Sequence, residues 1–210
     1  MKDSLALPPE PDPDPHRDPL AAAVVAETCE RGYEHSTEAG VIERAGVSER
    51  EFRRRFESLD DCALDSYERF IADFERHTGS AFNRQDEWPA SLRAAAYAAV
   101  DWMLQNPALA QFGGAEVLKV PGGLGQVRHE EVLEFCASMI DRGREAATEE
   151  VPESASMVAV GSVGQLLTQR LQEGAKLNFY EVIPELMYRI VSVYLGEEAA
   201  RAELAAGRPE

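Results

Sequence analysis

Residues 36–56, STEAGVIERAGVSEREFRRRF, have the pattern of two short helices joined by a tight turn. Ser36 and Ser48 are each placed to cap one of these helices, because a serine oxygen accepts a hydrogen bond from an unpaired amide of a first helical turn. Between them, Gly46 can take the left-handed conformation that ends a helix. The stretch therefore predicts a helix-turn-helix.

The second of these helices has an aromatic side and a basic side. Phe52 and Phe56 are one turn apart and share a face. The remaining faces carry the candidate DNA contacts Glu49, Arg50, Arg53 and Arg54. A helix that is held by aromatic residues and presents arginines is how a helix-turn-helix offers its recognition helix to the major groove.

The position of each charged residue in this helix suggests its role. Arg50 lies early in the helix and suits a base edge, whereas Arg53 and Arg54 suit phosphates. We expect Arg55 to fold back onto an acid such as Glu51. Glu49 can accept a hydrogen bond from a cytosine amine or simply cap the helix.

The amino-terminal part of the chain resembles the signature of the tetracycline-repressor (TetR) family. The matching residues are Arg31-Gly32-Tyr33, Ser36, Glu43-Arg44-Ala45-Gly46-Val47-Ser48 and Phe56. The resemblance implies an all-α homodimer that binds double-stranded DNA through a helix-turn-helix, including Ser36 and Ser48. It also implies a helical-bundle domain that binds a small-molecule effector and forms the dimer.

The order of helix signals gives a division of the chain into four parts. Residues 1–17 are rich in Pro and Asp and predict a disordered tail. A DNA-binding domain is predicted over 18–58, opened by the capping pair Asp18-Pro19. A linking helix over 59–78, capped by Ser58, leads to a ligand-binding and dimerisation domain over 79–210. Thr78–Trp88 is predicted to be a loop.

Composition fits a globular protein but the charge does not favour bulk attraction to DNA. The net charge is −17, and residues 1–78 carry 10 basic and 19 acidic residues, a balance of 10 − 19 = −9. Binding is therefore expected to depend on the local arginines of 50–55. The three cysteines form no paired motif, and no apolar run is long enough to span a bilayer, so we expect a cytoplasmic protein.

Aromatic and methionine residues on the helices of the larger domain are candidates for an apolar effector pocket. The same residues at helical spacing also suit an ordinary core. They are Tyr97, Trp102, Met103, Phe112, Phe135, Met139 and Met157. Asp101, within an apolar helix, can recognise a cationic ligand or lie on the helix surface.

The last two long helices are predicted to form the dimer interface, as the resemblance implies. Small residues permit close approach, and two apolar stripes can complete a four-helix contact around a two-fold axis. The candidate residues are Gly161, Gly164, Leu167, Leu171, Leu186, Ile190 and Val193. Packing within one chain would use the same residues.

Catalytic, metal and cofactor motifs find no support in the sequence. PGGLG at 121–125 lacks the lysine and hydroxyl of a phosphate-binding loop. We therefore predict a ligand-responsive DNA-binding regulator, a repressor of a near-palindromic operator that a small apolar molecule releases. The alternative is a helical dimer with a degenerate DNA-binding head, acting as a small-molecule or protein-binding module. Glu38 and Leu59, where the family has an apolar residue and a lysine, favour that alternative.

Overall fold

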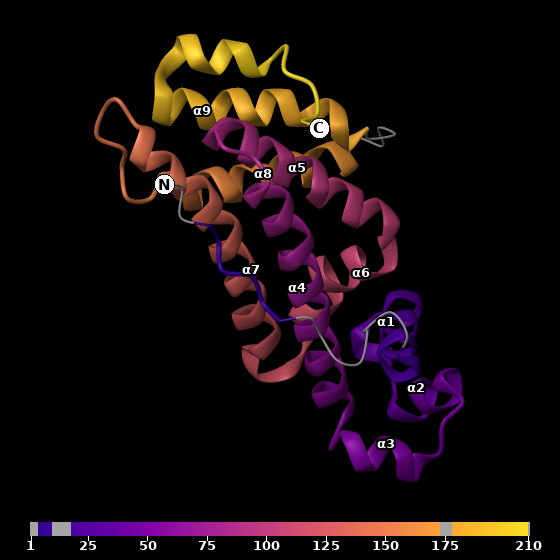
Figure 1. The fold of residues 1–210 in the computed structure, drawn as a ribbon. Coiled ribbons are helices and arrows are strands. Elements are labelled where there is room, and N and C mark those ends of the chain that lie inside the picture. Colours follow the sequence, from indigo (N-terminus) through magenta and orange to yellow (C-terminus); the bar gives the residue numbers. More distant parts are fainter. Residues whose placement is uncertain (1–3, 10–17, 173–177, 210) are drawn as a thin grey trace. The chain divides into compact units, whose positions relative to one another are not determined.

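A computed structural model describes residues 4–9, 18–172 and 178–209, without the side chains of 164–172. Helices account for nearly all of this part of the chain, and it contains no strand (Figure 1). The predicted all-α class is confirmed. None of the helices described is long and apolar enough to cross a membrane.

The helices follow one another with short connections. The α-helices are α1 (Pro19–Arg31), α2 (Glu38–Ala45), α3 (Glu49–Arg55), α4 (Leu59–Asn83), α5 (Trp88–Gln105), α6 (Pro107–Gln111), α7 (Leu124–Asp141), α8 (Ala155–Gln172) and α9 (Phe179–Glu203). Short 3₁₀ or π turns are η2 (Tyr33–His35), η3 (Phe112–Glu116), η4 (Val117–Lys119), η5 (Pro121–Gly123) and η6 (Arg142–Ala146).

The chain forms two compact units. The head unit contains the described residues of 8–76 together with 102–132, and therefore α1–α3, most of α4, and α6 to the first part of α7. The bundle unit contains the described residues of 4–7, 77–101 and 133–209.

Local signals set the ends of the first three helices. The Asp18 side chain accepts from the Leu20 amide and Pro19 opens α1, as predicted. Gly46 ends α2 in the left-handed conformation, with φ 66°. Ser48 and Glu51 form a reciprocal capping box that begins α3.

The cap of α2 corrects the expectation for Ser36. Thr37 is the capping residue, and its Oγ1 accepts from the Gly40 amide at 3.1 Å. Ser36 lies one residue earlier and its hydroxyl donates to the Gly32 carbonyl at 2.8 Å. Two adjacent hydroxyl residues offered the same chemistry, and the backbone register of the turn selected the second.

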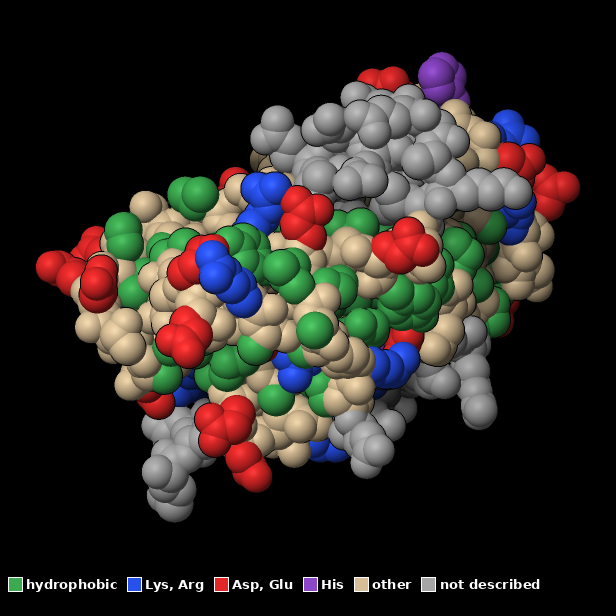
Figure 2. Space-filling view, turned by 90° about the horizontal axis from the view of Figure 1, so that it is seen from above, with side chains coloured by type: hydrophobic (Ala, Val, Ile, Leu, Met, Phe, Trp, Pro, Cys, Tyr) green, Lys and Arg blue, Asp and Glu red, His purple; other side chains and the backbone are tan. Residues whose placement is uncertain are grey.

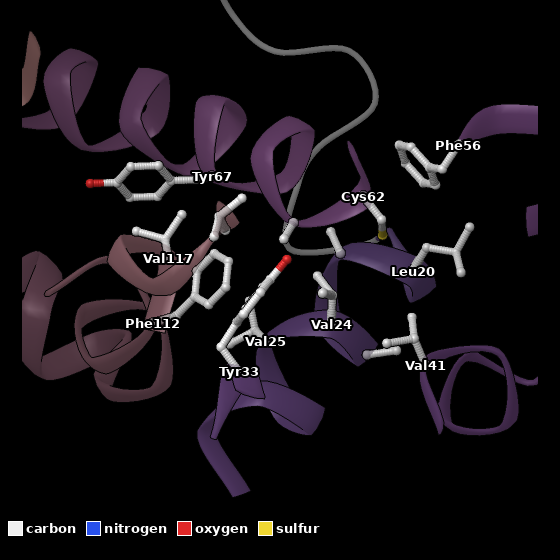
Figure 3. Packing of buried hydrophobic residues seen from close by; sticks show 14 of the residues in the cluster. Leu20, Val24, Val25, Tyr33, Val41, Phe56, Cys62, Tyr67, Phe112 and Val117 are labelled. Atoms are coloured by element: carbon white, nitrogen blue, oxygen red, sulfur yellow. The ribbon is translucent and has the colours of Figure 1, made fainter. Parts of the chain in front are cut away.

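The core of the head unit joins the helix-turn-helix to a segment far along the chain. Leu20, Val24, Val41 and Phe56 pack in one buried cluster (Figure 3). Phe112 and Val117, from η3 and η4, complete this cluster, and both are fully buried, at 0% exposure. Helix–turn–helix packing therefore depends on residues 112–120 as well as on α1–α3.

An indole ring organises part of the bundle unit. Trp88 lies against the Tyr194 ring at 5.1 Å between centroids, and its Nε1 donates to the Met139 carbonyl at 3.0 Å. A Cβ at Gly143 would lie 2.4 Å from the same indole, so only glycine leaves room for it. These contacts join α5 and α9 to the end of α7 and the turn that follows.

Several element limits differ from those predicted. Helix α4 continues to Asn83 where a loop was expected, because the buried Ala81 and Phe82 extend its apolar face. The long helix α7 begins at Leu124 and ends at Asp141, giving way to η6. Helix α9 runs to Glu203, but Gly196, with φ 81° and ψ 176°, breaks it into two parts.

The segment 4–9, which the sequence assigns to a tail, carries a buried residue. Leu5 is 8% exposed, and its amide donates to Asn83 Oδ1 at 2.9 Å while Asn83 Nδ2 donates to its carbonyl at 3.1 Å. A Cβ on Gly79 would collide with the Leu7 side chain, at 2.4 Å. Leu5 and Leu7 therefore pack against the end of α4.

The first turn of α7 gives a test of the head unit's packing. A Cβ on Gly125 would lie 1.9 Å from the Val117 carbonyl oxygen, which is backbone and cannot rotate away. Gly125→Ala is expected to lower the free energy of unfolding by about 1–3 kcal/mol in urea denaturation followed by circular dichroism. Gly114→Ala, where nothing lies within 4 Å, should change it by less than about 0.5 kcal/mol. Equal effects of the two substitutions would contradict this packing.

Candidate nucleic-acid interface

Helix α3 is anchored to the head core by its aromatic side. Phe52 is fully buried and Phe56 is 4% exposed, with their ring centroids 5.7 Å apart, as the spacing predicted. The charged residues Glu49, Arg50, Arg53 and Arg54 are all exposed. The helix therefore presents a charged face to solvent while its opposite face is held by packing.

Arg50 and Arg54 are the arginines of α3 available for a partner. Within the described residues, neither side chain forms an ion pair or a hydrogen bond. Arg50 lies in the first turn and Arg54 in the last, so they are one helical turn apart along the same face. Free guanidinium groups pay no cost of breaking an internal pair when they bind an anion or a base.

Arg53 is held by groups of the same head. Its guanidinium pairs with the Glu38 carboxylate on α2 and donates to the Glu57 carbonyl. Both side chains of the ion pair remain partly exposed, at 45% and 30%. Arg53 can reach a phosphate only in competition with Glu38.

Arg55 does not fold back onto Glu51, which corrects the sequence expectation. Glu51 is engaged with Ser48, accepting from its amide and its hydroxyl, both at 2.8 Å. These hydrogen bonds lower the pKa of Glu51. Arg55 instead donates to both oxygens of the Asp18 carboxylate, 37 residues earlier in the chain.

Asp18 joins three helices through one buried carboxylate. Its side chain is 1% exposed and accepts from the Leu20 amide, from Arg55 on α3 and from Arg69 on α4, the last at 2.9 Å. Burial alone would raise the pKa of Asp18, but the Arg55 hydrogen bond and charge, the Leu20 amide and the Arg69 charge lower it overall. From the sequence, Asp18 was expected only to cap a helix.

A second set of acids ties η2 to the rest of the head. The Tyr33 amide donates to Glu116 Oε2 at 2.7 Å, and the Tyr33 hydroxyl donates to Asp60. Burial, followed by the Asp60 hydrogen bond and charge, raises the pKa of Tyr33. Glu116 is 7% exposed and pairs with Lys119 at 3.0 Å. Sequence reasoning missed Glu116 because its partner lies 83 residues away.

Glu27 fixes the approach of α1 to α2. Its carboxylate is 1% exposed and pairs with Arg44 at 2.7 Å and with Arg31 at 3.2 Å. A Cβ on Gly40 would lie 2.2 Å from Glu27 Oε1. The signature residues Arg31 and Arg44, together with Gly40, thus surround one buried acid.

The residues predicted to line an effector pocket are divided between the two units. Tyr97, Phe135, Met139 and Met157 belong to the bundle unit, and Trp102, Met103 and Phe112 to the head unit. Phe112 lies in the head core, edge-on to Tyr67 at 6.1 Å, and Trp102 Nε1 donates to Asp73 at 2.8 Å. Met157 is 45% exposed. The predicted pocket stays a prediction.

A hollow in the head unit has a different lining. It measures about 270 Å³ and lies between α4 and α7, bordered by Glu68, Ile71, Ala72, Glu75, Arg128 and Glu131. Burial and the neighbouring Glu131 raise the pKa of Glu75. None of the seven predicted pocket residues borders this acidic hollow.

The predicted dimer residues include exposed apolar side chains. Val193 is 52% exposed, Leu186 half-buried and Ile190 9% exposed, and a Cβ at Gly161 would meet open space. Gly164, Leu167 and Leu171 lie among the side chains that the structure leaves undescribed. Figure 2 shows a broad band of apolar side chains on the face seen from above.

Solved structures share this arrangement of helices. The fatty acid degradation regulator FadR from Bacillus halodurans is 16% identical, with a TM-score of 0.72 over 83% of this chain and 97% of that one. FadR from Bacillus subtilis, solved in complex with stearoyl-CoA, is 15% identical with the same TM-score and the same coverage. A TetR-family transcription regulator from Marinobacter aquaeolei VT8 is 17% identical, with a TM-score of 0.66 over 86% and 96% of the two chains.

The chain therefore has the all-α fold of TetR-family transcriptional regulators, as the resemblance implied. No protein-family model and no curated protein sequence matches it. At this level of identity the shared property is the fold, and the residues of this chain have to supply the argument for function.

The buried carboxylate of Asp18 provides a test of how α3 is held. Asp18→Asn keeps the shape but removes the charge between Arg55 and Arg69, and should lower the free energy of unfolding by about 2 kcal/mol at neutral pH. Because the folded pKa of Asp18 is lowered, the stabilisation is present above the unfolded pKa of about 3.9 and is lost as pH falls through the folded pKa.

The variant should therefore lose stability less steeply than the wild type as the pH is lowered below about 5. Urea denaturation at a series of pH values measures both effects. Glu49→Gln, on the exposed face of the same head, is the matched control and should change stability by less than about 1 kcal/mol, the usual effect of one acid in a first helical turn. Parallel pH profiles for wild type and Asp18→Asn would show that the carboxylate is not what holds α3.

Proposed function

We propose that the chain is a ligand-responsive, DNA-binding transcriptional regulator that acts in the cytoplasm as a homodimeric repressor. The observation that carries this proposal is α3, a helix anchored by Phe52 in which Arg50 and Arg54 are exposed and form no ion pair or hydrogen bond with the residues that the structure describes. The fold shared with TetR-family regulators supports it. The buried Asp18 holds this helix through Arg55, and the buried Glu27 holds α2 against α1 through Arg44.

The two free arginines suit different parts of a DNA site. Arg50, in the first turn, can make a bidentate contact to guanine, worth about 1–3 kcal/mol of discrimination. Arg54, in the last turn, can contact a phosphate, and Arg53 can do so if the phosphate displaces Glu38. Ser48 and Glu49 stand beside Arg50 at the start of the helix.

The acidity of the chain makes such binding depend on a few contacts. With Arg54, and Arg53 where Glu38 is displaced, on phosphates, a dimer would neutralise about two to four charges, giving a salt dependence with a slope of about −2 to −4. The surrounding acids, part of a net charge of −17, oppose non-specific binding. We expect a protein whose affinity for its specific DNA site greatly exceeds its affinity for other DNA.

Dimerisation would place two recognition helices on one duplex. The exposed Met157 and Val158 on α8 and Val193 on α9 suit an interface between copies, because large apolar side chains are 45%, 62% and 52% exposed there. In a two-fold dimer the half-sites would be about 34 Å apart, or a multiple of that distance, on a near-palindromic operator.

The effector is proposed to be a small apolar molecule. Bacillus subtilis FadR, a solved structure of similar fold, was determined with stearoyl-CoA, which supports an effector in this class of protein. Such a molecule would release DNA by binding one of two states of the chain more tightly than the other.

Arginine substitutions in α3 test the proposed binding to DNA. In gel shifts with a duplex selected from a random library, Arg50→Ala should weaken specific binding about 5- to 100-fold, through loss of a base contact. Arg54→Ala should weaken binding to all sequences and reduce the salt slope by about 1 per subunit. Arg53→Ala should have a smaller effect, because Arg53 is already paired with Glu38.

Arg201→Ala is the control, since Arg201 is an arginine of α9 that is 71% exposed. If Arg201→Ala lowers the affinity for DNA as much as Arg50→Ala does, binding depends on the overall charge of the protein and not on a site at α3. If wild-type protein selects no duplex at all, the alternative function holds. The pairing of Arg53 with Glu38 and of Arg55 with Asp18, which engages two arginines of the head, favours that alternative.

The dimer is tested by placing charge in the exposed apolar face. Val193→Glu is expected to raise the dimer dissociation constant by tenfold or more, because about 2 kcal/mol or more is needed to bury each unpaired carboxylate. Sedimentation equilibrium measures this change. Leu124→Glu on α7, where the leucine is 55% exposed, should leave the dimer intact. An unchanged dimer in Val193→Glu would move the interface elsewhere.

A further inference from the structure

A carboxylate and two aromatic rings meet at one place in the bundle unit. Asp101 lies in α5 and its side chain is 15% exposed. The Tyr180 hydroxyl, from the first turn of α9, donates to Asp101 Oδ1 at 2.7 Å. The rings of Tyr97 and Tyr180 are stacked, with centroids 6.0 Å apart and 20° between their planes.

A guanidinium group from elsewhere in the unit occupies this place. Arg208 Nη1 donates to Asp101 Oδ1 at 3.3 Å and Nη2 donates to Oδ2, while the guanidinium carbon lies 5.8 Å from the centre of the Tyr97 ring. The carboxylate fork and the aromatic face are the two groups that recognise a planar cation best. Tyr180 holds the fork in position.

The segment that carries Arg208 is weakly attached. Helix α9 ends at Glu203, and Leu204, the apolar residue that follows it, is 53% exposed. The Arg208 side chain is itself 55% exposed, so only its tip is held. The amides of Ala205 and Ala206 donate to the carbonyls of Ala202 and Glu203, both at 3.3 Å, but in the described part of the chain neither Gly207 nor Pro209 forms a hydrogen bond. Removing Arg208 from the site therefore disturbs little besides its own ion pair.

We propose that Asp101, Tyr97 and Tyr180 form a binding site for a small organic cation that ends in a guanidinium or primary ammonium group, with Arg208 as its internal competitor. A free ligand makes the same contacts without the cost of ordering residues 204–208. The guanidinium form should bind better than the ammonium form, because only a planar fork can donate to both carboxylate oxygens. This site goes beyond the proposed function and does not require DNA binding.

The test uses Arg208→Ala and butylguanidinium in isothermal titration calorimetry. The variant vacates the carboxylate, so it should bind the probe about tenfold or more tightly than the wild type does, since the internal competitor is gone. Adding Asp101→Asn to this variant should weaken binding about 10- to 100-fold, as expected for loss of a charge-assisted hydrogen-bond pair. Circular dichroism verifies that both variants are folded.

Matched controls separate recognition from general effects. Butylurea has the same shape without the charge and should not bind, and Arg201→Ala, on the same α9, should leave the weak wild-type binding unchanged. Arg208→Gln, which retains a polar stem, replaces Arg208→Ala if the alanine variant does not fold.

Absence of binding in the folded Arg208 variant, binding that survives Asp101→Asn, or equal binding of butylurea would each overturn the proposal. Gel shifts on the same protein samples keep this outcome distinct from the proposed function. A variant that binds its DNA but not butylguanidinium rejects the cation site alone.

Discussion

The arrangement of the head depends on a carboxylate that has almost no contact with water. Asp18 is 1% exposed, and Arg55 and Arg69 provide the charge that its burial requires. A carboxylate moved out of water without partners would cost several kcal/mol and would take up a proton instead. Here the lowered pKa of Asp18 indicates that its partners outweigh burial. The pair adds little net stability over an apolar equivalent, but it permits only the arrangement in which α1, α3 and α4 meet at this point.

The same principle explains how an acidic protein can present basic residues. Arg44, Arg53 and Arg55 are neutralised by Glu27, Glu38 and Asp18 of the same unit. These pairs use acids to fix helix positions, and they leave Arg50 and Arg54 as the cations of α3 without such partners among the described residues. Net charge is therefore a poor guide to this surface, because it counts paired and unpaired groups alike. The local distribution of partners decides what DNA would meet.

Local chemistry made the first half of the fold predictable from sequence. Capping by Asp18 and Ser48, the left-handed Gly46 and the one-turn spacing of Phe52 and Phe56 each depend on a few neighbouring residues. The partner of Arg55 could not be predicted, because 37 residues separate it from Asp18 and Glu51 offered a nearer acid. The end of α4 was missed for a similar reason. Ala81 and Phe82 follow a polar stretch that resembles a loop until tertiary packing buries them.

A head linked in this way restricts how a signal can reach α3. Arg69 pairs with Asp65 on its own helix and with Asp18, and Asp18 in turn holds Arg55 at the end of α3. Moving α3 alone would break an ion pair whose carboxylate is buried, at a cost comparable to the whole effect of a typical effector, about 1–3 kcal/mol. Moving α1 and α3 together with the first half of α4 breaks none of these pairs. A change of state in this protein is therefore expected to move the head as one body with α4, and to leave the face carrying Arg50 and Arg54 intact while changing where it points.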